Sequence, residues 1–177
     1  RQTLLFSATY PEGIECLSAQ FMREPQIVKV AAQHAAHKIR QLFFEVREDQ
    51  RLPAVVSLLA HYRPARTLAF CNTRQQCREL TERLRAQGLV ALALYGELEQ
   101  RERDQVLVQF ANHSCSVLVA TDVASRGLDV QGLDAVINFT ITPDPQVHIH
   151  RIGRTGRGDA EGLALCLASL DEMGAVG

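Results

Sequence analysis

The chain has 177 residues, 46% of them apolar, with a formal net charge of −1. This size and composition fit one ordinary globular domain, or one domain plus a piece of another. The balanced charge gives no support for a generally basic surface, so any nucleic-acid site has to be local. No apolar run reaches the ~18 to 20 residues that span a membrane, and the first residues lack the form of a signal peptide.

Cysteine and histidine usage points to a reduced, metal-free protein. The five cysteines are Cys16, Cys71, Cys77, Cys115 and Cys166. Their number is odd and they form no CxxC pair, which predicts thiols in a cytoplasmic protein, several of them filling the core. His148 and His150 form an HxH pair, but no second ligand cluster has metal spacing, so we predict no metal site.

The first 38 residues differ from the rest in their pattern of apolar and polar residues. Residues 3–6 predict a buried strand, Pro11 suits the first turn of a helix, and residues 26–30 predict a short strand. Residues 31–38 contain no large apolar side chain and predict a linker. A domain rarely opens on a finished strand, so we expect a fragment of a longer protein.

From Ile39 onward strands and helices alternate with short connections. The predicted strands are 39–46, 67–72, 90–95, 116–120, 134–139 and 162–168, and the predicted helices are 52–62, 74–87, 99–112 and 146–152. Thr73 is a candidate N-cap and Gly88 a candidate residue just past a helix end. The pattern predicts an α/β fold with a mainly parallel sheet and helices on both faces.

Polar segments follow several of these strands. They read "NTR" at 72–74, "GELEQRER" at 96–103 and "TDVASRGLD" at 121–129, while Ser7 and Thr9 follow the strand at 3–6. Ligands of parallel sheets bind beyond the carboxyl ends of the strands. Any one such loop is polar in most proteins, but their joint occurrence predicts a binding edge.

A basic segment, "HIHRIGRTGRG" at 148–158, carries three arginines and three glycines. The nearest acidic residues are Asp144 and Asp159. One interpretation is a solvated basic loop. The other is a set of guanidinium groups directed at an anion held outside this segment.

The motifs "SAT", "FCNTR", "ELEQRERDQ", "ATDVASRGLD" and "HRIGRTGR" occur in this order. The chain resembles the second half of a DEAD-box RNA helicase over essentially its whole length. The residues in and around these motifs are most similar to the bacterial DbpA branch. The resemblance implies a RecA-like fold. It divides the chain into the tail of a first RecA-like domain (1–30), a linker (31–38) and the second RecA-like domain (39–177).

The same resemblance implies roles at the nucleotide. Arg154 and Arg157 would be arginine fingers at the γ-phosphate of ATP, with Asp129 on the ribose and Gly127 allowing close approach. Guanidinium is planar and permanently charged, which suits this work, and Gly156 permits the turn between the two arginines. Mg²⁺ would be held by the first domain, because this chain contains no GxxxxGK[ST] loop and no Asp-Glu-Ala-Asp.

For RNA the resemblance implies contacts to the backbone of a single strand or short duplex. Thr121 and Arg103 would contact phosphates, Gln100 would support Arg103, and Asn72 and Thr73 would lie near the RNA backbone. Such contacts carry little sequence preference.

Four residues would join the two domains. Ser7 and Thr9 would couple ATP state to closure, and His150 and Arg151 would contact the first RecA-like domain of the same chain. Arg151 has an alternative role as the partner of a carboxylate such as Asp122.

The resemblance has one departure, since relatives often carry His-Gly-Asp where this chain has Tyr95-Gly96-Glu97. We therefore expect an ATP-dependent RNA helicase whose isolated fragment is inactive, with a role in large-subunit ribosome assembly if the DbpA resemblance extends that far. A catalytically inactive RNA-binding scaffold and a DNA helicase of the same fold remain as alternatives.

Overall fold

The computed structural model describes residues 3–6, 14–28, 38–125, 130, 132–156 and 160–175. The chain separates into two compact units, Arg1–Gln33 and His34–Gly177. The domain limits that the sequence predicts, at 30 and 38, stay a prediction. Among the described residues, no helix has the length and apolar character needed to cross a membrane.

The small unit contains one described helix, α1 (Ile14–Phe21), which follows the predicted position of a helix after Pro11. Residues 3–6 and 25–28 do not form strands, so the strand predicted at 3–6 is wrong and that at 26–30 is absent over its described part. A strand needs a neighbour for its backbone N–H and C=O groups. The described part of the small unit offers none.

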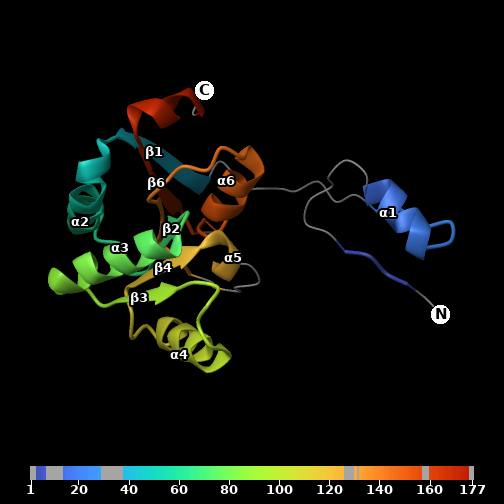
Figure 1. Cartoon of the computed structure of the whole chain (residues 1–177), viewed down its shortest axis with the longest axis horizontal. Helices are drawn as coiled ribbons and strands as arrows, with labels where there is room; N and C mark the ends of the chain where they lie inside the picture. Colours follow the sequence, from blue (N-terminus) through green and yellow to red (C-terminus); the bar gives the residue numbers. More distant parts are fainter. Residues whose placement is uncertain are drawn as a thin grey trace. The chain divides into compact units, whose positions relative to one another are not determined.

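The large unit is built on a six-stranded, all-parallel sheet in the order β1-β6-β5-β2-β4-β3 (Figure 1). The strands are β1 (Ile39–Glu45), β2 (Thr67–Cys71), β3 (Ala91–Leu94), β4 (Val117–Thr121), β5 (Ala135–Asn138) and β6 (Gly162–Ala168). The helices are α2 (Arg51–Tyr62), α3 (Arg74–Ala86), α4 (Gln100–Ala111), α5 (Asp122–Ser125) and α6 (Pro145–Ile152), with short 3₁₀ turns at Glu48–Gln50 and Leu170–Ala175. The predicted parallel α/β fold is confirmed.

Both faces of the sheet are covered by helices. In β2, Ala69 and Cys71 belong to the core cluster that includes buried residues of α2 and α3. Leu68 and Phe70, which alternate with them, belong to a second cluster with Phe110 of α4. This period of two, with every residue of β2 buried, explains why the strand reads as a continuous apolar run.

Helix α3 begins where its sequence predicts and ends one residue earlier, at Ala86. The Thr73 hydroxyl accepts the N–H of Gln76, and the Gln76 side chain accepts the N–H of Thr73, forming a capping box. Gly88 follows the end of the helix with a φ of +79°, a conformation that favours glycine. Helix α5 was not predicted, because four residues are too few for a 3.6-residue period to show.

The strand order brings the polar segments that follow β2, β4 and β5 close together. β2 is hydrogen-bonded to β4 on one side and to β5 on the other, with Cys71 opposite Thr121 and Phe70 opposite Asn138. Because the strands are parallel, the segments that follow β2, β4 and β5 leave the sheet at one edge. Helix α6, which comes after β5, also lies at this edge.

Candidate functional site

A buried arginine joins the strand ends. The side chain of Arg151, near the end of α6, is only 1% exposed. Its Nε and Nη2 atoms donate to the two carboxylate oxygens of Asp122 at 2.7 and 2.6 Å. Nη2 also donates to Asn72 Oδ1 at 2.9 Å, and Nη1 donates to the carbonyl of Thr140 at 2.7 Å. The guanidinium thus binds residues that follow β2, β4 and β5.

This arrangement satisfies the conditions for burying a permanent charge. A buried guanidinium is costly unless a counter-charge and acceptors surround it. Here the pairing with Asp122 is bidentate, and the ring of Phe70 lies under the guanidinium with 5.3 Å between its centre and Cζ. The carboxylate pairing of Arg151, which the sequence left as an alternative, is present.

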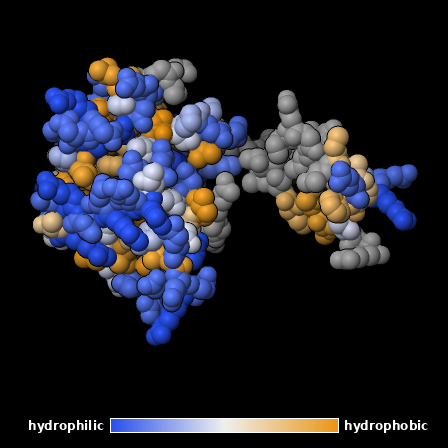
Figure 2. Space-filling view, viewed as in Figure 1, coloured by the Kyte–Doolittle hydropathy of each residue, from blue (hydrophilic) through white to orange (hydrophobic). Residues whose placement is uncertain are grey.

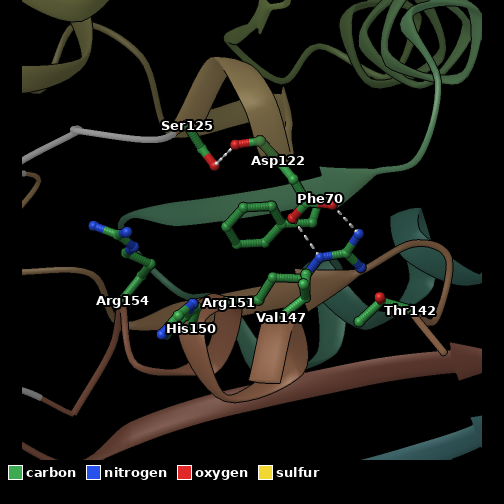
Figure 3. A pocket seen from close by; sticks show the side chains of 8 residues that line it. All are labelled: Phe70, Asp122, Ser125, Thr142, Val147, His150, Arg151 and Arg154. Carbon is green, nitrogen blue, oxygen red and sulfur yellow. Dashed lines mark hydrogen bonds and ion pairs between the residues drawn. The ribbon is translucent and has the colours of Figure 1, made fainter. Parts of the chain in front are cut away.

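A pocket of about 220 Å³ opens beside this arginine. It is lined by Phe70, Asp122, Ser125, Thr142, Val147, His150, Arg151 and Arg154. Figure 3 shows Arg151 directed at Asp122, while the Arg154 side chain extends away from α6 on the opposite side of Phe70. The pocket therefore combines one arginine that is locked in place with a second, half-buried one at its rim. Cationic side chains in such a concave site suit a phosphate group.

The turn that carries Arg154 is fixed from two sides. The hydroxyl of buried Thr155 donates to the carbonyl of Leu133 at 2.5 Å, which anchors the turn at the start of β5. Gly156 has a φ of +66°, and a Cβ there would lie 2.7 Å from Cγ1 of Ile39. Only glycine meets both requirements without strain, and Gly156 therefore lets the chain turn after Arg154.

The residues predicted to bind RNA follow β2, β3 and β4. Thr73 is exposed and caps α3, and Thr121 is half-buried at the end of β4. Gln100, in the first turn of α4, donates to Asp104 at 2.7 Å. Arg103, one turn later, donates from Nη2 to the carbonyl of Ala124 at 2.5 Å. This bond joins α4 to α5 and directs Arg103 toward the edge where β4 ends.

Five predicted site residues lie outside the described residues. They are Ser7, Thr9, Gly127, Asp129 and Arg157. The structure therefore brings together His150, Arg151 and Arg154 around one pocket, with Asn72 attached through Arg151. The roles of all these residues stay proposals.

The two histidines of the HxH pair have separate surroundings. His148 lies against β1, where its Nε2 is 3.1 Å from Gln41 Oε1 and its ring stacks on Phe43. Burial, followed by the nearby charge of Arg151, lowers the pKa of His148 below its usual value. His150 instead lines the pocket. The described residues contain no cluster of three or more His, Cys, Asp or Glu side chains suited to a metal ion.

The cysteines of the large unit are core residues. Cys71, Cys77, Cys115 and Cys166 are buried thiols. A hydrogen bond with Cys77, together with burial, raises the pKa of Cys71 well above its usual value. The burial of these four side chains confirms the expectation that several cysteines fill the core.

Tyr95-Gly96-Glu97, where relatives often carry His-Gly-Asp, contacts two arginines of α3. Arg78 donates from Nε to the Tyr95 hydroxyl at 3.2 Å, with its guanidinium 4.9 Å from the ring centre. Arg74 forms an ion pair with Glu97 at 2.6 Å. Both contacts hold the loop after β3 against the start of α3.

Several polar residues that build the site were not predicted from the sequence. Asn138 and Thr140 supply acceptors for Arg151, and Arg51 is a second buried arginine, donating to the carbonyls of Phe139 and Leu167. An asparagine inside the apolar strand "AVIN" was a usable signal, because a buried amide needs a partner. Nothing in the local sequence marks Arg51 as buried.

The sequence also matches known proteins. Residues 50–159 match the family model of the helicase conserved C-terminal domain. The chain is 46% identical over 172 residues to the ATP-dependent RNA helicase DbpA of Escherichia coli, covering 97% of this chain and 38% of that protein. It is 41% identical over 175 residues to the DEAD-box ATP-dependent RNA helicase CshA of Geobacillus kaustophilus, covering 98% and 38%. This chain belongs to the DEAD-box RNA helicase family, as its C-terminal helicase domain.

Solved DEAD-box structures share the fold. A DEAD-box protein from Methanococcus jannaschii superposes with a TM-score of 0.75 at 36% identity, covering 97% of this chain and 46% of that one. Dbp5 of S. cerevisiae, solved with Gle1 and IP6, superposes with a TM-score of 0.82 at 26% identity, covering 99% and 46%. The chain spans about 38% of the length of these curated DEAD-box relatives.

Proposed function

We propose that this DEAD-box domain is one half of an ATP-dependent RNA helicase, which hydrolyses ATP while it separates short RNA duplexes. The observation that carries the proposal is the pocket where Arg154 and His150 lie beside the locked Arg151–Asp122 pair. The relatives DbpA and CshA are ATP-dependent RNA helicases, which supports the same activity.

At the nucleotide, Arg154 and Arg157 would stabilise the charge that develops on the transferring γ-phosphoryl group. An arginine finger contributes on the order of 10³ to 10⁵ in rate. Asp129 would accept a hydrogen bond from the ribose, and Gly127 would admit the nucleotide close to the backbone. A phosphate would lie in the pocket that Arg154 and His150 help to line, and the first domain would hold ATP together with Mg²⁺.

At the RNA, the exposed edge beyond β2, β3 and β4 would contact the backbone. Thr73 and Thr121 offer hydroxyls there, and Arg103 offers a cation with Gln100 one turn away. Asn72 lies at the same edge. Contacts of this kind fix the strand without reading its sequence.

The partner across the nucleotide would be the first RecA-like domain of the same protein. Apolar side chains on the small unit support this, because Phe6, Phe21 and Val28 are 87%, 70% and 83% exposed. Figure 2 shows hydrophobic residues on the surface of this unit. Exposed apolar groups of this extent mark a surface that packs against something else. Ser7, Thr9 and His150 would then link ATP state to domain closure.

The similarity to DbpA extends the proposal to a cytoplasmic role in assembly of the large ribosomal subunit. RNA specificity would come from a domain outside this chain, since the edge described above would contact only the RNA backbone. Retention of Arg154 in the pocket favours hydrolysis over an inactive RNA-binding scaffold.

The test is phosphate release by the full-length protein with single-stranded RNA, with single-stranded DNA and without nucleic acid. We expect ATP hydrolysis that RNA stimulates and DNA does not. Residues 1–177 alone are expected to show none. Stimulation by DNA would favour a DNA helicase, and no hydrolysis by the full-length protein would favour the scaffold.

A further inference from the structure

Asn72 occupies an unusual position between the surface and the buried arginine. It is an exposed residue at the carboxyl end of β2, at the proposed RNA edge. Its side-chain oxygen nevertheless faces inward and accepts the Arg151 Nη2–H at 2.9 Å. The side-chain nitrogen lies 3.4 Å from the carbonyl of Ile141. The oxygen that would otherwise serve an RNA 2′-hydroxyl is already in use.

The backbone of Asn72 is held as well. Its N–H lies within 3.2 Å of both Gln76 Oε1 and Thr140 Oγ1. The first bond ties Asn72 to the capped start of α3, and the second ties it to the segment after β5. A displacement of this residue would therefore be passed on to its partners rather than absorbed locally.

Arg151 carries such a displacement toward the pocket. The residue belongs to the last turn of α6, and its carbonyl accepts the N–H of Arg154 at 3.2 Å. His150 is its neighbour in α6 and lines the pocket. The side chain of Arg151 thus links Asn72, at the RNA edge, to the turn that holds the proposed arginine finger. A hydrogen-bonded route between them runs from Asn72 through Arg151 to Arg154.

We propose that Asn72 is a positioning residue that couples RNA binding to ATP hydrolysis by fixing the orientation of Arg151. The inference rests on the proposed helicase function and assigns Asn72 a role beyond contact with the RNA backbone. A buried guanidinium keeps one orientation only while its acceptors surround it. With Asn72 in place, Arg151 sets the end of α6, and through it the position of Arg154.

The experiment uses three variants of the full-length protein. Asn72→Ala removes the acceptor of Arg151. Asn72→Asp keeps an oxygen at that position but adds a negative charge at the RNA edge. Gln75→Ala is the control, because Gln75 is exposed in the first turn of α3 and its side chain donates to Glu79. The measurements are kcat at saturating RNA, kcat without RNA, the RNA Kd without nucleotide, and the melting temperature.

For Asn72→Ala we expect kcat at saturating RNA to fall about tenfold, within the range for coupling residues. Its kcat without RNA should fall less than its kcat at saturating RNA, a split that a purely structural role would not give. Asn72→Asp should keep kcat at saturating RNA within about twofold while its RNA Kd rises, since it repels phosphate. Gln75→Ala should resemble wild type in all four measurements.

A rise in RNA Kd with unchanged kcat for Asn72→Ala would make Asn72 an ordinary RNA contact and overturn the inference. If Asn72→Ala melts far below wild type, Asn72→Asp decides, and a tenfold loss of kcat in that variant overturns the inference too. A wild-type protein without RNA-stimulated hydrolysis would instead contradict the proposed function. The two failures are therefore separated by the wild-type measurement.

Discussion

The carboxylate of Glu97 lies 2.6 Å from the guanidinium of Arg74 and so joins the loop after β3 to the first turn of α3. Both side chains are more than half exposed. An exposed pair of this kind contributes little to folding stability. Its effect is electrostatic, because it places an anion beside the edge where we propose that RNA phosphates bind.

Replacing that anion should strengthen RNA binding. Glu97→Gln removes the negative charge and releases Arg74, so RNA affinity should rise about twofold to fivefold at low salt and less at high salt. The measurement is fluorescence anisotropy of a labelled single strand at several salt concentrations. Glu82→Gln, an equal change of charge on an exposed residue farther along α3, is the matched control. Equal gains in both variants would show a bulk charge effect instead.

Arg103 and Arg101 form a second matched pair, two residues apart in the first turn of α4. Arg103 is half-buried and donates to Ala124, whereas Arg101 is exposed on the helix surface. Arg103→Ala should weaken binding about equally for unrelated RNA sequences and lower the slope of log K against log salt by roughly one contact. Arg101→Ala should have a smaller effect. A loss confined to one RNA sequence would contradict backbone contact.

Arg154→Lys tests the arginine finger. Lysine keeps the charge but loses the planar fork that meets the transferring phosphoryl group. We expect kcat at saturating RNA to fall at least about tenfold, with RNA affinity in the absence of nucleotide and the melting temperature unchanged. Steady-state phosphate release and a thermal melt provide the data. Unchanged turnover would move the catalytic role to Arg157, or to Arg126 in the segment "TDVASRGLD" at 121–129.

His148 gives the large unit a pH-dependent component of stability. Because its folded pKa is lowered, the unfolded chain binds the proton more readily, and stability falls as pH drops below the unfolded value of about 6.5. His148→Gln should flatten this part of the profile while keeping a polar group near Gln41. Urea unfolding between about pH 5 and pH 8 measures it. Parallel profiles for the two proteins would show that His148 does not contribute.

The sequence predicted the elements of the large unit well because each has its own period and boundary residues. The capping Thr73 and the glycine at 88 are local signals, readable without the fold. The strand at 3–6 failed because a strand depends on a neighbour, and no window of sequence contains that information. The polar edge was predicted from one rule alone, that ligands of parallel sheets bind beyond the carboxyl ends of the strands.

The hydrogen bonds inside the site were harder to predict from the sequence. The Arg151–Asp122 pair was one of two alternatives, since the sequence does not show whether a guanidinium faces inward or outward. Asn138 and Thr140 acquire their roles only because β5 lies beside β2 in the sheet. The inward oxygen of Asn72 follows from the same strand order, which pattern and spacing do not specify.

The contact between Gly156 and Ile39 has a mechanical consequence. Ile39 is the first residue of β1, the point at which the chain enters the sheet of the large unit, and its side chain fills the space that a Cβ at Gly156 would need. The turn holding Arg154 therefore rests directly on this entry point. A side chain at position 156 would therefore have to displace Ile39, so the start of β1 and the turn holding Arg154 can be packed together only with glycine there.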